Sequence, residues 1–111
     1  RSTFDIALPD ATRDADYLAA LAPALDTLLD AARPDIIFYQ AGVDVHLDDR
    51  LGRLALSDAG IAVRDSFIAQ AARTRGIALV GTLGGGYGDD VMAIAARHAR
   101  VMRACEAAYF G

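Results

Sequence analysis

Two short segments of this chain hold most of the side chains that could carry out chemistry. Residues 41–49 read Ala-Gly-Val-Asp-Val-His-Leu-Asp-Asp and place three carboxylates and an imidazole within six positions. Oxygen and nitrogen donors at this density suit a divalent metal, although a solvated loop with turn-forming aspartates gives the same pattern. Residues 84–88 read Gly-Gly-Gly-Tyr-Gly, so a phenol follows a run of glycines.

The glycine run lets the backbone approach a ligand closely and adopt positive φ, which makes Gly85 and Gly86 candidate substrate-binding residues. A tight turn between a strand and a helix also explains it. A small nucleotide-binding domain is disfavoured, because Asp89 takes the last glycine position of the dinucleotide fingerprint and the lysine of a phosphate loop is absent.

Alternating helices and strands are expected to position these segments. Apolar residues recur at helical spacing over 18–32, after a possible cap at Thr12 or Asp14 and before Pro34, which ends the helix. Residues 35–40 and 77–83 are near-continuous apolar runs, typical of strands buried on both faces of a parallel sheet.

Two further helices complete the pattern. One is expected to begin at Ser57 or Asp58 and to end near Gly76, which suits a glycine cap. The other is expected to begin at Asp89 or Asp90. The residues expected to face inward are Ile61, Phe67, Ile68 and Ala71 on the first of these, and Val91, Ile94, Ala95, His98, Met102, Cys105 and Tyr109 on the second.

This order predicts an α/β fold with a parallel sheet, right-handed crossovers and flanking helices, in one domain spanning residues 1–111. Ligands bind at the carboxyl ends of parallel strands, and Asp44 and Tyr87 each lie four residues past a predicted strand. We therefore expect an acid and a phenol at one edge. Two strands alone do not make a stable sheet of this type, so upstream residues or another copy would supply the missing strands.

Composition restricts the possible partners and compartments. The net charge of −4 and pI near 4.9 argue against non-specific binding to nucleic acid. No apolar run is long enough for a membrane span, and the first residues do not have the basic-then-apolar pattern of a signal peptide. The single Cys105 fits a reducing, cytoplasmic compartment. All eleven residues counted as lysine or arginine are arginine, which suggests a GC-rich bacterial genome. The start at Arg1 rather than methionine suggests a piece of a longer or processed protein.

Three segments in order resemble the C-terminal half of the histone deacetylase superfamily. They are Pro-Asp-Ile-Ile-Phe-Tyr-Gln-Ala-Gly-Val-Asp at 34–44, Asp-Arg-Leu-Gly at 49–52 and Leu-Gly-Gly-Gly-Tyr at 83–87. The similarity runs from about Ile6 to the end and is strongest to bacterial relatives near the class IV deacetylases, a group that includes acetylpolyamine amidohydrolases and acetoin utilization proteins. It implies the arginase/deacetylase fold, of which only the C-terminal part is present.

The resemblance also implies roles. Enzymes of this family bind one catalytic zinc through two aspartates and a histidine, and the second aspartate corresponds to Asp44. The tyrosine that donates its hydroxyl to the substrate carbonyl corresponds to Tyr87. The implied reaction is hydrolysis of an acetyl amide on lysine or a polyamine. No ligand role passes to His46, and His98 and Cys105 are expected to be core residues, with Cys105 unreactive.

The family's Asp-x-His metal motif and its pair of catalytic histidines have no counterpart in this chain. The first hypothesis is therefore a zinc-dependent deacetylase represented by its C-terminal portion, with negligible activity for the chain alone. The alternative is a truncated, non-catalytic family member that acts as a binding or oligomerisation module.

Overall fold

The computed structural model describes residues 4–110 as alternating helices and strands. In chain order they are α1 (Asp14–Ala32), β1 (Ile36–Gly42), α2 (Asp58–Thr74), β2 (Ala78–Gly84) and α3 (Val91–Phe110). This is the order that the sequence predicted. The strands pair in parallel from Ile36 with Ala78 to Gly42 with Gly84, so both end at the same edge.

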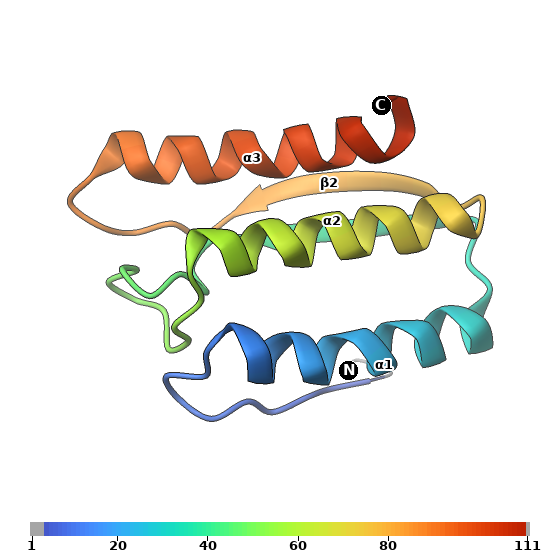
Figure 1. The fold of residues 1–111 in the computed structure, drawn as a ribbon, viewed down its shortest axis with the longest axis horizontal. Helices are drawn as coiled ribbons and strands as arrows, with labels where there is room; N and C mark the ends of the chain where they lie inside the picture. Colours follow the sequence, from blue (N-terminus) through green and yellow to red (C-terminus); the bar gives the residue numbers. More distant parts are fainter. Residues whose placement is uncertain (1–3, 111) are drawn as a thin grey trace.

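The helices cover one side of this small sheet. Figure 1 shows α2 in front of the strands, with α3 above it and α1 below it. The buried core lies between these layers and consists of two clusters: Leu29, Ala71, Ala72 and Ile77 in one, and Tyr39, Ala41, Ile68 and Val101 in the other. No helix among residues 4–110 has the length and apolar character needed to cross a membrane.

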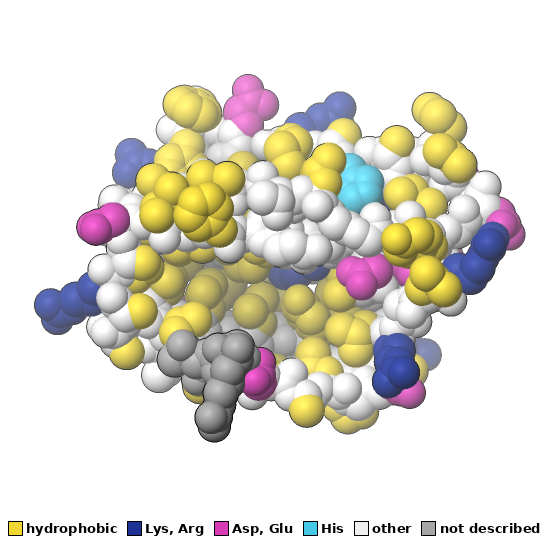
Figure 2. Space-filling view, turned by 180° about the vertical axis from the view of Figure 1, so that it is seen from behind, with side chains coloured by type: hydrophobic (Ala, Val, Ile, Leu, Met, Phe, Trp, Pro, Cys, Tyr) yellow, Lys and Arg dark blue, Asp and Glu magenta, His cyan; other side chains and the backbone are white. Residues whose placement is uncertain are grey.

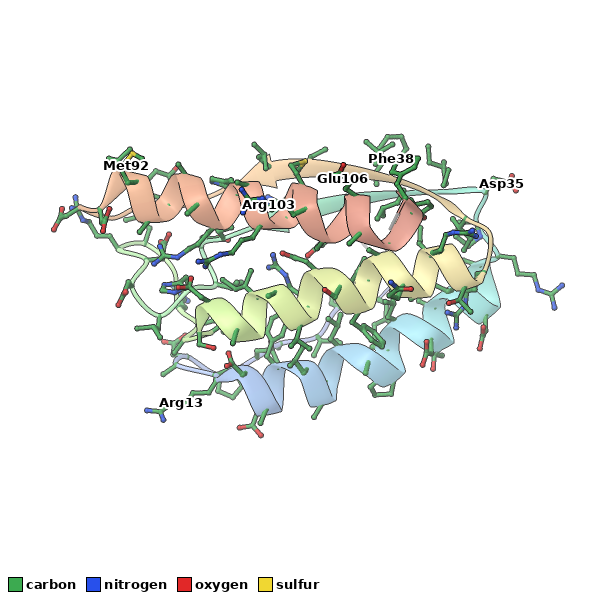
Figure 3. The ribbon with its side chains drawn as sticks, turned by 45° about the horizontal axis from the view of Figure 1, so that its top comes forward. Arg13, Asp35, Phe38, Met92, Arg103 and Glu106 are labelled. Carbon is green, nitrogen blue, oxygen red and sulfur yellow. The ribbon has the colours of Figure 1, made fainter. Side chains whose placement is uncertain are left out.

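The other side of the sheet is open, so the prediction of strands buried on both faces is wrong for the described residues. Tyr39 and Ala41 point to the helices and are buried, whereas Phe38 is 72% exposed. Ile36 and Val80 are exposed as well. Figure 3 shows Phe38 on the opposite side of the molecule from α1, and Figure 2 shows hydrophobic side chains gathered on the rear face. A continuous apolar run signals two covered faces, but the described elements cover only one.

The predicted helix ends are correct for α2 and α3. The Ser57 hydroxyl accepts a hydrogen bond from the Gly60 amide at 3.0 Å, and Gly76 follows α2 with φ +67°. The Asp90 carboxylate accepts from the Ala93 amide at 3.0 Å, so Asp90 caps the start of α3.

The predicted cap of α1 is wrong. Its N-cap residue is Arg13, which makes no side-chain cap bond. The Thr12 hydroxyl donates to the Pro9 carbonyl at 2.6 Å, and the Asp14 carboxylate instead accepts from the Ser57 amide at 2.8 Å. A partner far along the chain has taken the side chain that the local pattern assigned to the cap.

The predicted inner face of α3 is right only in part. Ile94, His98 and Tyr109 are half-buried, but Val91 is 71% exposed. Val101, which lies outside the predicted stripe, is fully buried. It packs in the cluster that contains Tyr39 and Ile68, because α3 contacts both α2 and β2.

Candidate functional site

The two chemistry-bearing loops meet at the carboxyl edge of the sheet. The Val43 amide donates to the Gly84 carbonyl at 3.1 Å. A Cβ atom added at Gly85 would lie 2.7 Å from Cβ of Asp44, and one at Gly86 would lie 3.0 Å from a methyl group of Val43. In Figure 1 the arrowhead of β2 points to the end of the molecule where both loops lie. The predicted meeting of the Asp44 and Tyr87 segments is therefore observed in the backbone.

Asp44 follows β1 and its side chain is exposed at this edge. Glycines make room for it, because a Cβ at Gly42 would come within 2.8 Å of one Asp44 carboxylate oxygen. Gly85 lies against the same side chain from the other loop. Small residues on both sides thus leave the carboxylate accessible to a ligand.

Tyr87 has a fixed backbone and an accessible side chain. Its amide donates to the Asp49 carboxylate at 2.7 Å, and its carbonyl accepts from the Arg50 amide at 2.8 Å. The side chain is 54% exposed. Gly85 and Gly86 precede it with φ of +63° and +99°, values that glycine adopts without strain.

His46 has a structural position. The residue is 4% exposed, its Nδ1 accepts from the Asp48 amide at 3.0 Å, and its Nε2 lies 3.1 Å from the Asp58 carboxylate. Both ring nitrogens therefore have partners within the chain.

The acidic residues of residues 41–49 do not converge. Asp48 points to Arg97 at 3.9 Å, while Asp49 bonds to backbone amides. Among residues 4–110, no three His, Cys, Asp or Glu side chains form a group that could hold a metal ion. Within the described residues, the donors of this loop therefore do not form a three-ligand metal site, and Asp44 can offer a metal one carboxylate.

Asp58, the first residue of α2, joins the loop of residues 43–57, called here the metal-motif loop, to α3. Its carboxylate lies 3.0 Å from Nε of Arg97 and 3.3 Å from Arg100, in addition to its contact with His46. Partial burial raises the pKa of Asp58, but the Arg97 hydrogen bond and the neighbouring positive charges outweigh it and leave the pKa below its ordinary value. Asp58 therefore stays ionised and holds the loop against both helices.

A buried polar network lies beneath the end of β1, and sequence reasoning missed it. Arg64 and Asp65 are 3% and 0% exposed. Arg64 donates to the Gly42 carbonyl at 2.7 Å and to Asp65 at 2.9 Å, and the Tyr39 hydroxyl donates to the same Asp65 oxygen. Burial raises the pKa of Tyr39, so its phenol stays neutral. The available signal was a charged pair on the inner face of α2, between Ile61 and Ile68.

His98 and Cys105 are half-buried on α3 rather than fully in the core. A Cβ at Gly86 would lie 3.2 Å from Nε2 of His98. This imidazole therefore packs beneath the loop of residues 85–90, called here the tyrosine loop. Burial raises the pKa of the Cys105 thiol, and the charge of Asp65 adds to this effect. A raised pKa disfavours the reactive thiolate.

Comparisons with known proteins agree with this geometry. Residues 1–103 match the histone deacetylase domain. The chain is 37% identical over 109 residues to an uncharacterised protein of Picosynechococcus, covering 98% of this chain and 36% of that protein. It is 38% identical over 72 residues to histone deacetylase 2 of Arabidopsis thaliana, covering 65% of this chain and 19% of that protein.

A solved structure gives the same fold. The crystal structure of an acetylpolyamine aminohydrolase from Burkholderia pseudomallei superimposes with a TM-score of 0.76 at 21% identity, over 94% of this chain and 28% of that one. The chain therefore has the arginase/deacetylase fold. It spans about a third or less of the length of each of these relatives.

Proposed function

Because the chain belongs to the histone deacetylase family, we propose that it is the C-terminal portion of a zinc-dependent enzyme that hydrolyses acetyl amides. The substrate classes we propose are acetylated lysine and acetylated polyamines. The name of the Burkholderia protein points to the second class, and the name of the Arabidopsis protein to the first. We further propose a bacterial, cytoplasmic protein, on its composition and single cysteine.

One observation carries the proposal. The loop that begins with Val43 and Asp44 and the loop that holds Tyr87 leave adjacent parallel strands and touch at the carboxyl edge, where Gly85 lies against Asp44. A carboxylate and a phenol at the ligand-binding edge of a parallel sheet suit the chemistry of a metal-assisted hydrolase.

The residues present fit part of a zinc site. A catalytic zinc takes about three protein ligands and an open position, and Asp44 supplies one ligand. The chain's other candidates are engaged elsewhere, as His46 and Asp49 show. We therefore propose that an upstream part of the domain supplies the remaining ligands and the general base. When bound, zinc would polarise the amide carbonyl and acidify a bound water.

The role proposed for Tyr87 follows from the charge that develops during hydrolysis. As water adds to the acetyl group, the carbonyl oxygen becomes an oxyanion. The Tyr87 hydroxyl would donate a hydrogen bond to that oxygen, and loss of one such donor typically costs about 3–4 kcal/mol of transition-state stabilisation. Because Gly42 and Gly85 have no side chains, they would leave space beside Asp44 for the acetyl group.

The test compares the complete protein with the 111-residue chain. We expect the complete protein to contain zinc and to hydrolyse an acetyl-lysine peptide or an acetylpolyamine. Tyr87→Phe should lower kcat about 100- to 1,000-fold, because the oxyanion loses its donor. Tyr17→Phe on α1 is the matched control and should leave kcat unchanged. The 111-residue chain should show no turnover.

Two results would contradict the proposal. One is hydrolysis by the complete protein that Tyr87→Phe leaves unchanged. The other is turnover by the isolated chain that disappears in the same variant. The intact mass of each sample identifies its form, because the 111-residue chain has a mass of 11.7 kDa and a larger mass indicates the longer protein.

The exposed sheet face favours a second candidate, a non-catalytic module that binds a partner or a second copy through Ile36, Phe38 and Val80. Light scattering and metal analysis of the natural protein separate the two. A metal-free oligomer supports the module, and a monomer with stoichiometric zinc rules it out.

A further inference from the structure

We propose that Asp49 is a positioning residue, which fixes where Tyr87 lies relative to Asp44. The inference rests on the proposed function, since it concerns the same site. It adds a residue to which neither the family motifs nor the loop's acidic character assigned a task. Asp49 would not touch the substrate but would act through the backbone of Tyr87.

The two oxygens of the Asp49 carboxylate have separate tasks. One oxygen accepts from the amides of Leu51 and Gly52, at 3.0 and 2.9 Å, and closes the turn of its own loop. The other accepts from the amide of Tyr87 at 2.7 Å, across a sequence separation of 38 residues. A single half-buried side chain therefore joins the metal-motif loop to the tyrosine loop.

The neighbouring residues complete this contact. The Arg50 amide donates to the Tyr87 carbonyl at 2.8 Å, so both backbone polar groups of Tyr87 are held by consecutive residues. The Arg50 side chain also pairs with Asp89, which lies just past the tyrosine. Tyr87 is thus held on both sides by the segment that follows Asp44.

The same segment is fixed to Asp44. A Cβ atom at Gly52 would overlap the Asp44 carbonyl oxygen, so the turn that Asp49 closes packs directly on the backbone of Asp44. The path from Asp44 through this turn to Asp49 and on to Tyr87 is therefore short and continuous. It links the proposed metal ligand to the proposed oxyanion donor without any residue from outside this chain.

The tyrosine loop needs such an anchor because its own backbone is permissive. Gly85 and Gly86 precede Tyr87, and glycine has more conformational freedom than any other residue. A misplacement of about 1 Å can cost about 100-fold in rate. A hydrogen bond from an amide to an ionised carboxylate is about twice as strong as a neutral one, which suits it to hold this position.

A substitution can remove one task and keep the other. Asp49→Asn keeps an amide oxygen for Leu51 and Gly52 but places an NH₂ group opposite the Tyr87 amide. Asp48→Asn is the matched control, because that carboxylate is 68% exposed and points to Arg97 instead. Asp49→Glu restores a carboxylate acceptor and should recover part of what Asp49→Asn loses.

The first experiment measures amide hydrogen exchange by NMR on the complete protein. Asp49→Asn should speed exchange of the Tyr87 amide about 10- to 100-fold, while amides of β1 stay protected and show that the chain remains folded. Asp48→Asn should leave the Tyr87 amide unchanged. Equal Tyr87 protection in wild type and in folded Asp49→Asn would overturn the inference.

The second experiment measures kinetics in the complete protein. We expect Asp49→Asn to lower kcat about 10- to 100-fold with little change in KM, because the donor is misplaced while substrate contacts remain. A kcat equal to that of Asp48→Asn would count against the inference. A wild-type protein that is inactive, but whose Tyr87 amide depends on Asp49, would contradict the proposed function and still support the positioning role.

Discussion

Gly85 has φ +63°, and a side chain there would meet Asp44. Gly85→Ala should therefore lower the free energy of unfolding for two reasons. The left-handed backbone costs about 1–2 kcal/mol with a side chain present, and displacing Asp44 adds to that cost. Gly76→Ala is the matched control, since Gly76 has φ +67° but no atom within 4 Å of its added Cβ. Urea unfolding of both variants measures the difference. Equal losses would mean that the Gly85–Asp44 contact has no energetic weight.

At the scale of single residues, the sequence identified the residues that have a local signature. Gly85 and Gly86 stood out as a run, and Asp44 and Tyr87 as motif residues, and the structure brings their loops together. It did not identify the task of Asp49. That task depends on an amide 38 residues away, and a local pattern holds no information on such a partner.

The Arg64 network ties α2 to the end of β1. Arg64→Ala should lower the free energy of unfolding by about 3–5 kcal/mol, because it leaves the buried Asp65 carboxylate without a positive partner and the Gly42 carbonyl without its Arg64 donor. Arg75→Ala is the control. Its ion pairs with Asp26 and Asp30 are at the surface, so it should cost below about 1 kcal/mol.

Urea unfolding of the complete protein measures both variants. A loss in Arg64→Ala no greater than that in Arg75→Ala would show that the buried pair does not hold the strand. The result also bears on the site, since Gly42 lies two residues before Asp44.

Helix and strand order was predictable from apolar periodicity and from turn residues. The ends of α2 and α3 followed from Ser57 and Asp90, whose capping bonds are local. The cap of α1 was not predictable, because Asp14 bonds to Ser57 on another element. The need for further strands was predicted, but residues 36–42 alone do not show that one sheet face is open, because an apolar run reflects every surface that a strand packs against.

Phe38 lies on the open face of the sheet, which further elements of the domain would cover. In the complete protein, Phe38→Ser should lower the free energy of unfolding by about 3–5 kcal/mol, because further elements would cover this 72% exposed side chain. In the isolated chain the same change should cost little and should reduce self-association. Phe110→Ser is the control, at the end of α3, where the side chain is 88% exposed.

Urea unfolding measures the stability of each variant in both forms, and light scattering measures the self-association of the isolated chain. If Phe38→Ser leaves the complete protein as stable as wild type, the rear face of the sheet is not an internal surface of the domain. The second candidate function would then gain support.

The connections that hold Tyr87 all begin and end within residues 42–89. On the proposed function, the domain is divisible. This portion holds the Asp44 and Tyr87 loops together through its own residues, and the rest of the domain would present the remaining zinc ligands at the same edge. We therefore expect this portion and the rest of the domain, made as two separate polypeptides, to reassemble at this edge.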